Sequence, residues 1–346
     1  MSYTPEMILK LREEKKEMRN RDFALSIGIS EAELIAAYCT IGKAKKLRVD
    51  IFTLLDNAPK VGTVMALTRN KHAVHERTGC FETIIHDQHI PMALGEIGLR
   101  IFPKLWKFGF EYEMMVFGKL TKSLQFFDKH GIAIFKVYSQ DTTNMEEWNS
   151  LVEKLLDADQ SPVLDILSPP IQDQCNTTEL DIKKSLNHLK RSADTQQLCE
   201  IISELQTKCG VVKYSGNEFA EELREEAFEM MLKQTAQQEI PITCIVGNQG
   251  CIQIFNGTIQ NIKQMGPWLN ILEQKFHMHM LVSGIHKVWR VRKPTNNGYI
   301  SSLEVFDKTG EMIIQFFNLQ QDTKGESEKW RSLLNSLPLH QETAVV

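Results

Sequence analysis

The sequence predicts an α+β protein built by tandem duplication, in which each half is a large twisted antiparallel β-sheet with flanking helices. A motif occurs twice, because residues 123–129 (SLQFFDK) and 302–308 (SLEVFDK) begin 179 positions apart and a glycine follows each. Residues 67–72 align with 245–250 at an offset of 178. A third pair of anchors is Trp148 and Trp330, at an offset of 182. Three anchors at nearly constant offset indicate two copies of one unit.

The N-terminal region predicts helices. Residues 5–19 are charged and favour a helix, and residues 23–34 suggest a short helix, a glycine turn and a second helix. Ser30 and Glu33 have the spacing of a capping box. This is a helix-turn-helix shape, but the second helix carries Glu31 and Glu33 rather than the side chains that a recognition helix places in the major groove. We therefore expect no nucleic-acid partner.

The first copy is predicted to contain several antiparallel strands closed by a helix. Apolar and β-branched segments separated by turn residues indicate the strands. Trp148, Leu151 and Leu155 have helical spacing. The expected strands cover 61–69, 73–84, 108–119 and 122–127, a hairpin covers 126–134, and the closing helix covers 144–156.

A segment with three prolines and few regular patterns, at 157–180, predicts a linker. The second copy is predicted to have helices at 195–207 and 217–234, strands at 241–259, 275–282, 286–293, 299–306 and 311–319, and a closing helix at 326–336. We therefore predict an N-terminal repeat over residues 1–157, a linker over 158–180 and a C-terminal repeat over 181–346.

Composition and charge exclude several classes of protein. The net charge of −4 argues against general binding of nucleic acid or anionic membranes. No run approaches 18 apolar residues, so we expect no membrane insertion. Seven cysteines without a Cys-x-x-Cys motif indicate neither a disulfide framework nor a zinc ribbon. With no secretory signal visible, a cytoplasmic protein with free thiols is expected.

Two histidine motifs could bind a metal. In residues 69–76, strand alternation places His75 on one face and His72 and Glu76 on the other. His75 could ligate iron, or it could be a histidine at a strand end that is hydrogen-bonded to Glu76 or to backbone. His277 and His279 also share one face, but no nearby carboxylate or cysteine completes a ligand set, so a half-exposed strand with its methionines inward is favoured.

Two basic segments could bind an anion. Residues 290–293 place three cations close together at the end of a strand, which suits a carboxylate or phosphate, or forms a charged edge that discourages aggregation. Residues 99–106 combine Arg100 with large apolar side chains. That segment is either an apolar slot with a cationic rim, suited to a flat apolar dianion, or an ordinary core segment with an exposed arginine.

Several motifs resemble the HemS/ChuS-type haem-utilisation proteins over nearly the whole chain. They are ISEAEL (29–34), AVHE (73–76), LRIF (99–102), QFFD (125–128), VGNQGCIQIF (246–255), RKPT (292–295) and SLEVF (302–306). The resemblance implies the duplicated fold and a cytoplasmic protein that receives haem after import. It also implies haem as the ligand, with a haem ABC importer or a downstream haem acceptor as possible partners.

The resemblance also assigns residues. Arg100 matches a distal arginine, Phe102 an aromatic that packs nearby, Lys293 a pocket cation and Gln315 a polar pocket residue. His75 matches a histidine proposed as a second haem ligand.

Four pocket positions depart from the family pattern. Gln196 stands where the family carries the axial histidine, and His188 is the only histidine near it. Cys209 replaces an arginine, and Phe317 replaces a tyrosine. Another arginine is replaced by Gln320. The expected haem contacts are His75, Arg100, Phe102, Gln196, Lys293, Gln315 and Phe317, and the expected iron ligands are His75 and His188.

Three functions follow from this pattern. The first is haem binding and trafficking after import, with His75, His188 or a thiol such as Cys199 or Cys209 on the iron. The second is haem-oxygenase-like degradation that releases iron, against which Gln196 argues because an amide is a poor iron ligand. The third is a regulatory or scaffolding relative that does not bind haem.

Overall fold

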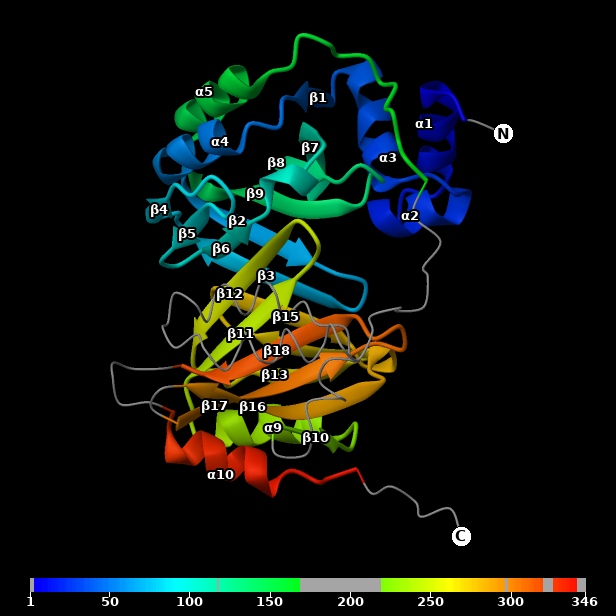
Figure 1. Cartoon of the computed structure of the whole chain (residues 1–346). Coiled ribbons are helices and arrows are strands. Elements are labelled where there is room, and N and C mark those ends of the chain that lie inside the picture. Colours follow the sequence, from blue (N-terminus) through cyan, green and yellow to red (C-terminus); the bar gives the residue numbers. More distant parts are fainter. Residues whose placement is uncertain (1–2, 117, 169–218, 296–297, 320–325, 341–346) are drawn as a thin grey trace. The chain divides into compact units, whose positions relative to one another are not determined.

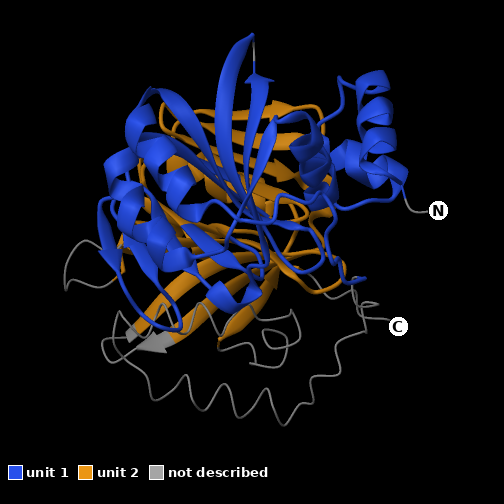
Figure 2. Ribbon diagram, turned by 90° about the horizontal axis from the view of Figure 1, so that it is seen from above, with its two compact units in different colours: residues 1–69, 75–170, 247–253 blue, residues 70–74, 171–246, 254–346 orange. Residues whose placement is uncertain are grey.

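The computed structural model describes residues 3–116, 118–168, 219–295, 298–319 and 326–340 (Figure 1). The chain divides into two compact units, each composed of segments that are not contiguous in the sequence (Figure 2). Unit 1 comprises residues 1–69, 75–170 and 247–253, and unit 2 comprises 70–74, 171–246 and 254–346. The repeat boundaries at residues 157 and 181 stay a prediction.

The main sheet of unit 1 is antiparallel and places strands from both ends of the unit side by side. Its order is β1 (Ala44–Leu47), β7 (Phe108–Val116), β8 (Lys119–Phe127), β9 (Ala133–Thr143), β2 (Gly62–Arg69) and β3 (Ala73–Gly79). Three short strands follow one another in a second antiparallel arrangement: β4 (Thr83–Ile85), β5 (Met92–Leu94) and β6 (Gly98–Ile101).

Helices lie on both faces of the main sheet of unit 1. On one face, α4 (Ile51–Asn57) and α5 (Met145–Leu155) bury Leu54 and Trp148 against Phe126 and Val137. On the other face lies α3 (Glu31–Ala37), which α1 (Pro5–Glu14) and α2 (Asn20–Ile27) precede. Short 3-10 turns complete the unit: η1 (Tyr38–Ile41), η2 (Ala58–Val61) and η3 (Pro103–Leu105).

Unit 2 repeats this order of elements. Its main antiparallel run is β10 (Ala220–Leu223), β16 (Lys287–Thr295), β17 (Gly298–Phe306), β18 (Met312–Asn318) and β11 (Ile242–Gly247), beside which lies β12 (Cys251–Gly257). A second run contains β13 (Ile262–Met265), β14 (Trp268–Leu272) and β15 (Phe276–Leu281), and the 3-10 turn η4 (Val282–Gly284) follows it.

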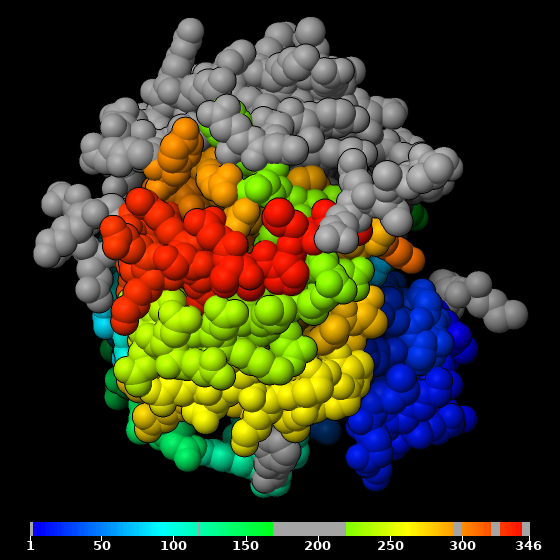
Figure 3. Space-filling view, turned by 90° about the horizontal axis from the view of Figure 1, so that it is seen from below, coloured from blue at the N-terminus to red at the C-terminus, as the bar shows by residue number. Residues whose placement is uncertain are grey.

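The described helices of unit 2 lie on one face of its main sheet. There α9 (Ala227–Gln237) and α10 (Glu328–Ser336) bury Phe228 and Trp330 against Val305 and Phe316. The two helices contact each other and lie side by side on the surface of the unit (Figure 3). Trp148 and Trp330, the anchors of the sequence repeat, therefore occupy equivalent buried places in α5 and α10.

The repeated motif folds into the same hairpin turn in both units. Asp128 Oδ1 accepts hydrogen bonds from the amides of residues 130 and 132, and Asp307 Oδ1 accepts from those of residues 309 and 311. Gly131 and Gly310 end these turns with φ of 69° and 82°, a backbone conformation that favours glycine. The predicted hairpin at 126–134 is confirmed.

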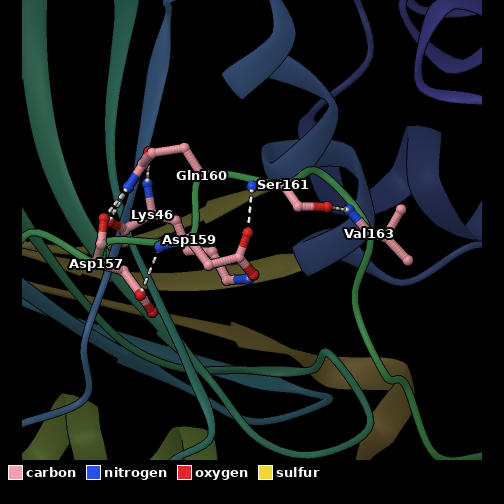
Figure 4. Close-up of polar contacts among 6 residues, drawn as sticks. All are labelled: Lys46, Asp157, Asp159, Gln160, Ser161 and Val163. Carbon is pink, nitrogen blue, oxygen red and sulfur yellow. Dashed lines mark hydrogen bonds and ion pairs between the residues drawn. The ribbon is translucent and has the colours of Figure 1, made fainter.

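The outer strands β1 and β10 are each covered on one edge by the chain that follows the closing helix. The Asp157 amide donates to the Lys46 carbonyl at 3.0 Å, and the His340 amide donates to the Glu222 carbonyl at 2.9 Å. In unit 1 the side chain of Gln160 adds two bonds to Lys46, because its Oε1 accepts from the amide and its Nε2 donates to the carbonyl, both at 2.9 Å (Figure 4). Covering an edge removes a template for aggregation.

Two predicted elements differ from the structure. The helix expected at 217–234 is wrong over its first part, where Ala220–Leu223 forms β10 and only Ala227–Gln237 is helical. The side chains of Glu221 and Glu222 form ion pairs with basic residues of β16, and these tertiary contacts outweigh a high helix propensity. The strand expected at 73–84 is interrupted and forms β3 and β4. The helix expected at 195–207 lies outside the described residues.

None of the described helices is by itself long and apolar enough to cross a membrane. Two neighbouring segments, Asn20–Ile27 and Glu31–Ile41, are together long and apolar enough to span a membrane, but the chain bends by 102° between them.

Candidate functional site

Unit 2 has a sheet face that its described helices do not cover, and it carries polar and aromatic side chains. Strand register aligns Trp289 with Glu304, and Glu304 with Gln315. The neighbouring row aligns Val291 with Ser302, and Ser302 with Phe317. We call this surface the polar face; its residues are Trp289, Val291 and Lys293 of β16, Ser302, Glu304 and Phe306 of β17, and Gln315 and Phe317 of β18.

An ion pair between two strands lies on the polar face. Lys293 Nζ is 2.8 Å from Glu304 Oε1, and the two side chains are 12% and 1% exposed. Ser302 Oγ donates to the same carboxylate oxygen at 2.8 Å. The Lys293 ammonium also lies 5.0 Å from the centre of the Phe317 ring, within range of a cation–π interaction. Both charged side chains thus belong to strands, and they neutralise each other without a side chain from a helix.

Besides Lys293 Nζ, which has its ion pair, two polar atoms on this face are buried without a hydrogen-bond partner among the described residues. They are Trp289 Nε1 and Gln315 Oε1, whose residues are 6% and 2% exposed. The amide nitrogen of Gln315 contacts the Met312 sulfur. Buried donors and acceptors are nearly always paired, and each exception needs an explanation such as a ligand. The polar face therefore offers one donor and one acceptor to a bound molecule.

Three of the residues that the sequence resemblance assigned to haem meet on this face. Lys293, Gln315 and Phe317 come from β16 and β18, which both flank β17. Neither Trp289 nor Glu304 was among the residues predicted from the sequence. The signal was present, because Trp289, Val291 and Lys293 alternate along one strand and therefore point to the same face.

The basic segment 290–293 is neither a charged edge nor a cluster of three available cations. The strand β16 lies between β10 and β17, so it is not an edge. Arg290 and Arg292 both form ion pairs with Glu221, at 2.6 and 2.8 Å. Arg290 also donates to the Leu334 carbonyl at 2.8 Å and so ties α10 to the sheet. The anion-binding hypothesis is therefore wrong for these two arginines.

In unit 1, the segment 99–106 is mostly core. Leu99, Ile101 and Trp106 are buried, and Trp106 Nε1 donates to the Gly250 carbonyl at 2.8 Å. Their burial favours the interpretation of an ordinary core segment over that of an apolar slot. Arg100 on β6 and Phe102, directly after it, are half-buried. Their assignment to haem stays a prediction.

His75 lies within β3 and is fully buried. It is therefore not at a strand end, where one interpretation placed it. Burial, assisted by the nearby charge of Arg77, lowers the pKa of His75 to about 3. The imidazole is therefore neutral at physiological pH, which is the form that ligates metals. His72 lies just before the strand, with its Nε2 3.4 Å from Asp307 Oδ2. The role of His75 as an iron ligand stays a prediction.

The strand β15 has the orientation that was predicted for the second histidine motif. Phe276, Met278 and Met280 are buried, and His277 and His279 are half-buried on the opposite face. His279 Nδ1 is 2.6 Å from Asn270 Oδ1 on β14.

The helix-turn-helix segment is built into the core of unit 1. Six of the seven residues of α3 are buried, and Glu31 Oε1 accepts a hydrogen bond from Lys136 Nζ at 2.5 Å. The predicted capping box between Ser30 and Glu33 is present. Because α3 is fixed against the sheet, its side chains are not available to a DNA groove.

The remaining site predictions lie outside the described residues. They are Gln196 and His188, together with the alternative thiols Cys199 and Cys209 and the changed position Gln320.

Comparison with known proteins finds relatives along almost the whole chain. The sequence model of the family described as haemin-degrading HemS.ChuX domain matches residues 28–155 and 206–337. The hemin transport protein HmuS of Yersinia pestis is 30% identical over 325 residues, which are 92% of each chain. The two matched ranges agree with the predicted duplication.

Solved structures agree with this result. The holo form of PhuS, a haem-binding protein from Pseudomonas aeruginosa, matches with a TM-score of 0.88 at 30% identity and covers 98% of this chain and 100% of that chain. ChuS, a haem oxygenase of E. coli, matches with a TM-score of 0.82 at 29% identity and covers 95% of this chain and 98% of that chain. The predicted α+β tandem duplication is confirmed.

Proposed function

This chain belongs to the family with the haemin-degrading HemS.ChuX domain, and on that premise we propose that it binds haem as cargo in haem uptake and iron acquisition. The observation that carries the proposal is the polar face of unit 2. There the cation Lys293 and the aromatic ring of Phe317 lie beside two buried polar atoms that have no partner among the described residues.

The chemistry of haem fits this set of side chains. Haem has flat apolar faces and two carboxylates, and a protein needs aromatic surface for the first and cations or N–H donors for the second. In this proposal Phe317 packs on the macrocycle and Lys293 pairs with a carboxylate. Gln315 accepts or donates a hydrogen bond beside them. Arg100 and Phe102 of unit 1 are proposed as further contacts.

The iron is proposed to take an axial ligand from a histidine. His75 is neutral at physiological pH because its pKa is lowered to about 3, so no proton competes for its ring nitrogens. His188 is the alternative, and Gln196 is proposed to contact the ligand without binding iron strongly.

The relatives described as haemin transport and haem-binding proteins support a trafficking role. We propose a cytoplasmic location, with a haem ABC importer as donor and a downstream haem-binding protein as acceptor. Transfer from haem-loaded importer in vesicles, compared with transfer from haem-loaded albumin, would test the first partner. A rate of haem transfer that rises with the concentration of this protein when the importer is the donor, but not when albumin is, supports the importer as a partner. The same dependence on concentration with both donors contradicts it.

Titration of the purified protein with haem, followed by absorbance, tests the proposed function. Wild type is expected to saturate near one haem per chain. Lys293→Met should weaken binding about tenfold, because a charge-assisted contact to a carboxylate is lost. His75→Ala and His188→Ala identify the axial ligand through loss of the low-spin spectrum. The matched control is Lys233→Met, an exposed lysine of α9. A wild-type spectrum that stays that of free haem contradicts the proposal.

The description of the family and of ChuS favours haem degradation as a second candidate function. Loaded protein would be given ascorbate in the presence of catalase. Loss of the haem absorbance with release of iron supports degradation, and a stable spectrum contradicts it.

A further inference from the structure

Trp289 differs from the other buried tryptophans of the described chain in its hydrogen bonding. Trp106 donates to the Gly250 carbonyl at 2.8 Å, Trp148 to Glu111 Oε1 at 3.0 Å, and Trp330 to the Ser301 carbonyl at 3.0 Å. Trp289 is 6% exposed, and its Nε1 has no acceptor among the described residues. The described residues thus supply acceptors to three buried indole groups and none to this one.

Packing alone does not require an indole at this position. Trp289 packs with Ala220, Val291 and Phe306. In unit 1 the equivalent position, 179 residues earlier, is Phe110, which is fully buried and aligns with Gln125 as Trp289 aligns with Glu304. A phenyl ring therefore fills this place in the repeated sheet. What the indole adds in unit 2 is the N–H group.

The acid opposite Trp289 does not satisfy that donor. Glu304 is its cross-strand neighbour, but Glu304 Oε1 interacts with Lys293 Nζ and accepts from Ser302 Oγ. The polar face therefore holds a second donor group, the indole N–H, beside the ammonium group of Lys293. The carboxylate of the face, that of Glu304, is bonded to Lys293 and Ser302. Such a donor matches a carboxylate that arrives with a ligand.

We propose that Trp289 is a ligand-contact residue whose Nε1–H donates a hydrogen bond to a carboxylate oxygen of the bound tetrapyrrole. This inference rests on the proposed function and adds a residue that the sequence resemblance did not assign. The hydrogen bond gives the buried indole a partner that the described residues do not supply, and it makes recognition of the carboxylate a property of the sheet of unit 2.

The test compares haem with its dimethyl ester, in which the carboxylates are blocked. Trp289→Phe keeps the aromatic volume and matches Phe110. It is expected to raise the Kd for haem about tenfold and to leave the Kd for the ester unchanged. Trp330→Phe is the matched control, because it removes an indole donor that bonds the Ser301 carbonyl on the helix side. It should lower stability and leave the ratio of the two Kd values as in wild type.

The outcomes separate the two proposals. Absence of haem binding by wild type contradicts the proposed function. If wild type binds haem, then a Trp289→Phe variant whose Kd for haem equals that of wild type, or whose Kd values for haem and ester rise equally, contradicts the role of Trp289. If the variant does not fold, the indole N–H resonance of wild-type Trp289 decides. It should move downfield with gallium protoporphyrin and stay in place with its dimethyl ester, and any other pattern overturns the inference.

Discussion

The equivalent sheet faces of the two units differ in what covers them and in how their buried charges are paired. In unit 1, α3 packs Ala32, Ile35 and Ala36 on Phe110 and Phe127. Position 136 is a lysine whose charge is balanced by Glu31 of that helix, both side chains being 8% exposed. We call this the helix-covered face; its residues are Phe110, Tyr112, Ser123, Gln125, Phe127 and Lys136.

In unit 2 the same positions carry different chemistry. Gln315 stands where unit 1 has Lys136, Glu304 where it has Gln125, and Lys293 where it has Met114, each at an offset of 179. The buried charges therefore pair strand to strand in unit 2, and sheet to helix in unit 1. One copy therefore uses this face to attach its N-terminal helices, whereas in the other the charges on the face neutralise each other without a described helix.

The largest expected effect comes from breaking the pair on the helix-covered face. Glu31→Gln leaves the buried Lys136 without a counter-charge, and removal of one partner of a buried pair costs about 3–5 kcal/mol of unfolding free energy. Urea unfolding measures this loss. The double variant Glu31→Gln with Lys136→Met should recover most of the stability. A loss below about 1 kcal/mol in the single variant would show that the helix does not need this pair.

A smaller effect is expected on the polar face. Glu304→Gln removes the counter-charge of Lys293, but the lysine is 12% exposed and keeps the Phe317 ring, so we expect a loss of about 2 kcal/mol. Because Lys293 is then available to a ligand carboxylate, haem should bind more tightly. Urea unfolding and haem titration measure the two changes. Weaker haem binding in a folded variant would contradict the idea that the face prepares Lys293 for a ligand.

The third prediction concerns His75 and its counterpart Gln253, at the offset of 178. The folded pKa of His75 is about 3, below the ordinary 6.5, so the unfolded chain takes up the proton first as pH falls. Stability is fully present above pH 6.5 and is lost towards pH 3, by about 1.4 kcal/mol per pH unit.

His75→Gln, which copies the other repeat, should remove this part of the pH dependence. The comparison requires the unfolding free energies of both proteins at pH 7.5 and at pH 5.5. The second pH lies about one unit below the ordinary histidine pKa. Parallel pH profiles would show that His75 takes up a proton in the folded protein.

The smallest effect concerns the covered strand edges. Gln160→Ala removes two hydrogen bonds to the Lys46 backbone that the β10 edge of unit 2 lacks among the described residues. We expect a loss of about 0.5–1 kcal/mol because the site is exposed. Light scattering on mild heating should show earlier association than in wild type. Ser161→Ala, which removes only a bond to the Val163 amide, is the control. Equal scattering by the two variants would assign edge protection to Asp157 alone.

Local patterns predicted most of the fold correctly. Strand alternation and turn residues located β2, β7, β8 and β15–β18, and helical spacing located α5 and α10. The prediction failed at Ala220–Leu223, where a sequence with high helix propensity forms β10. Glutamate has no strong preference for a strand by itself. Its pairing with Arg290 and Lys287, nearly 70 residues away, decides the conformation.

The candidate site was predicted only in part. The resemblance supplied Lys293, Gln315 and Phe317, which the structure brings together. It gave no reason to include Trp289 or Glu304, because their significance depends on strand register and on which hydrogen bonds the fold has already made. The same register removed Arg290 and Arg292 from the candidates, since Glu221 lies within reach of both.

Sequence patterns alone were enough to predict the duplication, many of the strands and helices, the hairpin at 126–134 and the membership of the family. These features rest on repeated motifs and on local periodicity, which neighbouring residues carry. Tertiary contacts were needed to learn which cation is balanced by which acid, which face of each sheet a described helix covers, and which buried polar group has no partner among the described residues. Those properties depend on contacts between residues far apart in the chain, and hydrogen bonds and desolvation make each such contact favourable or costly.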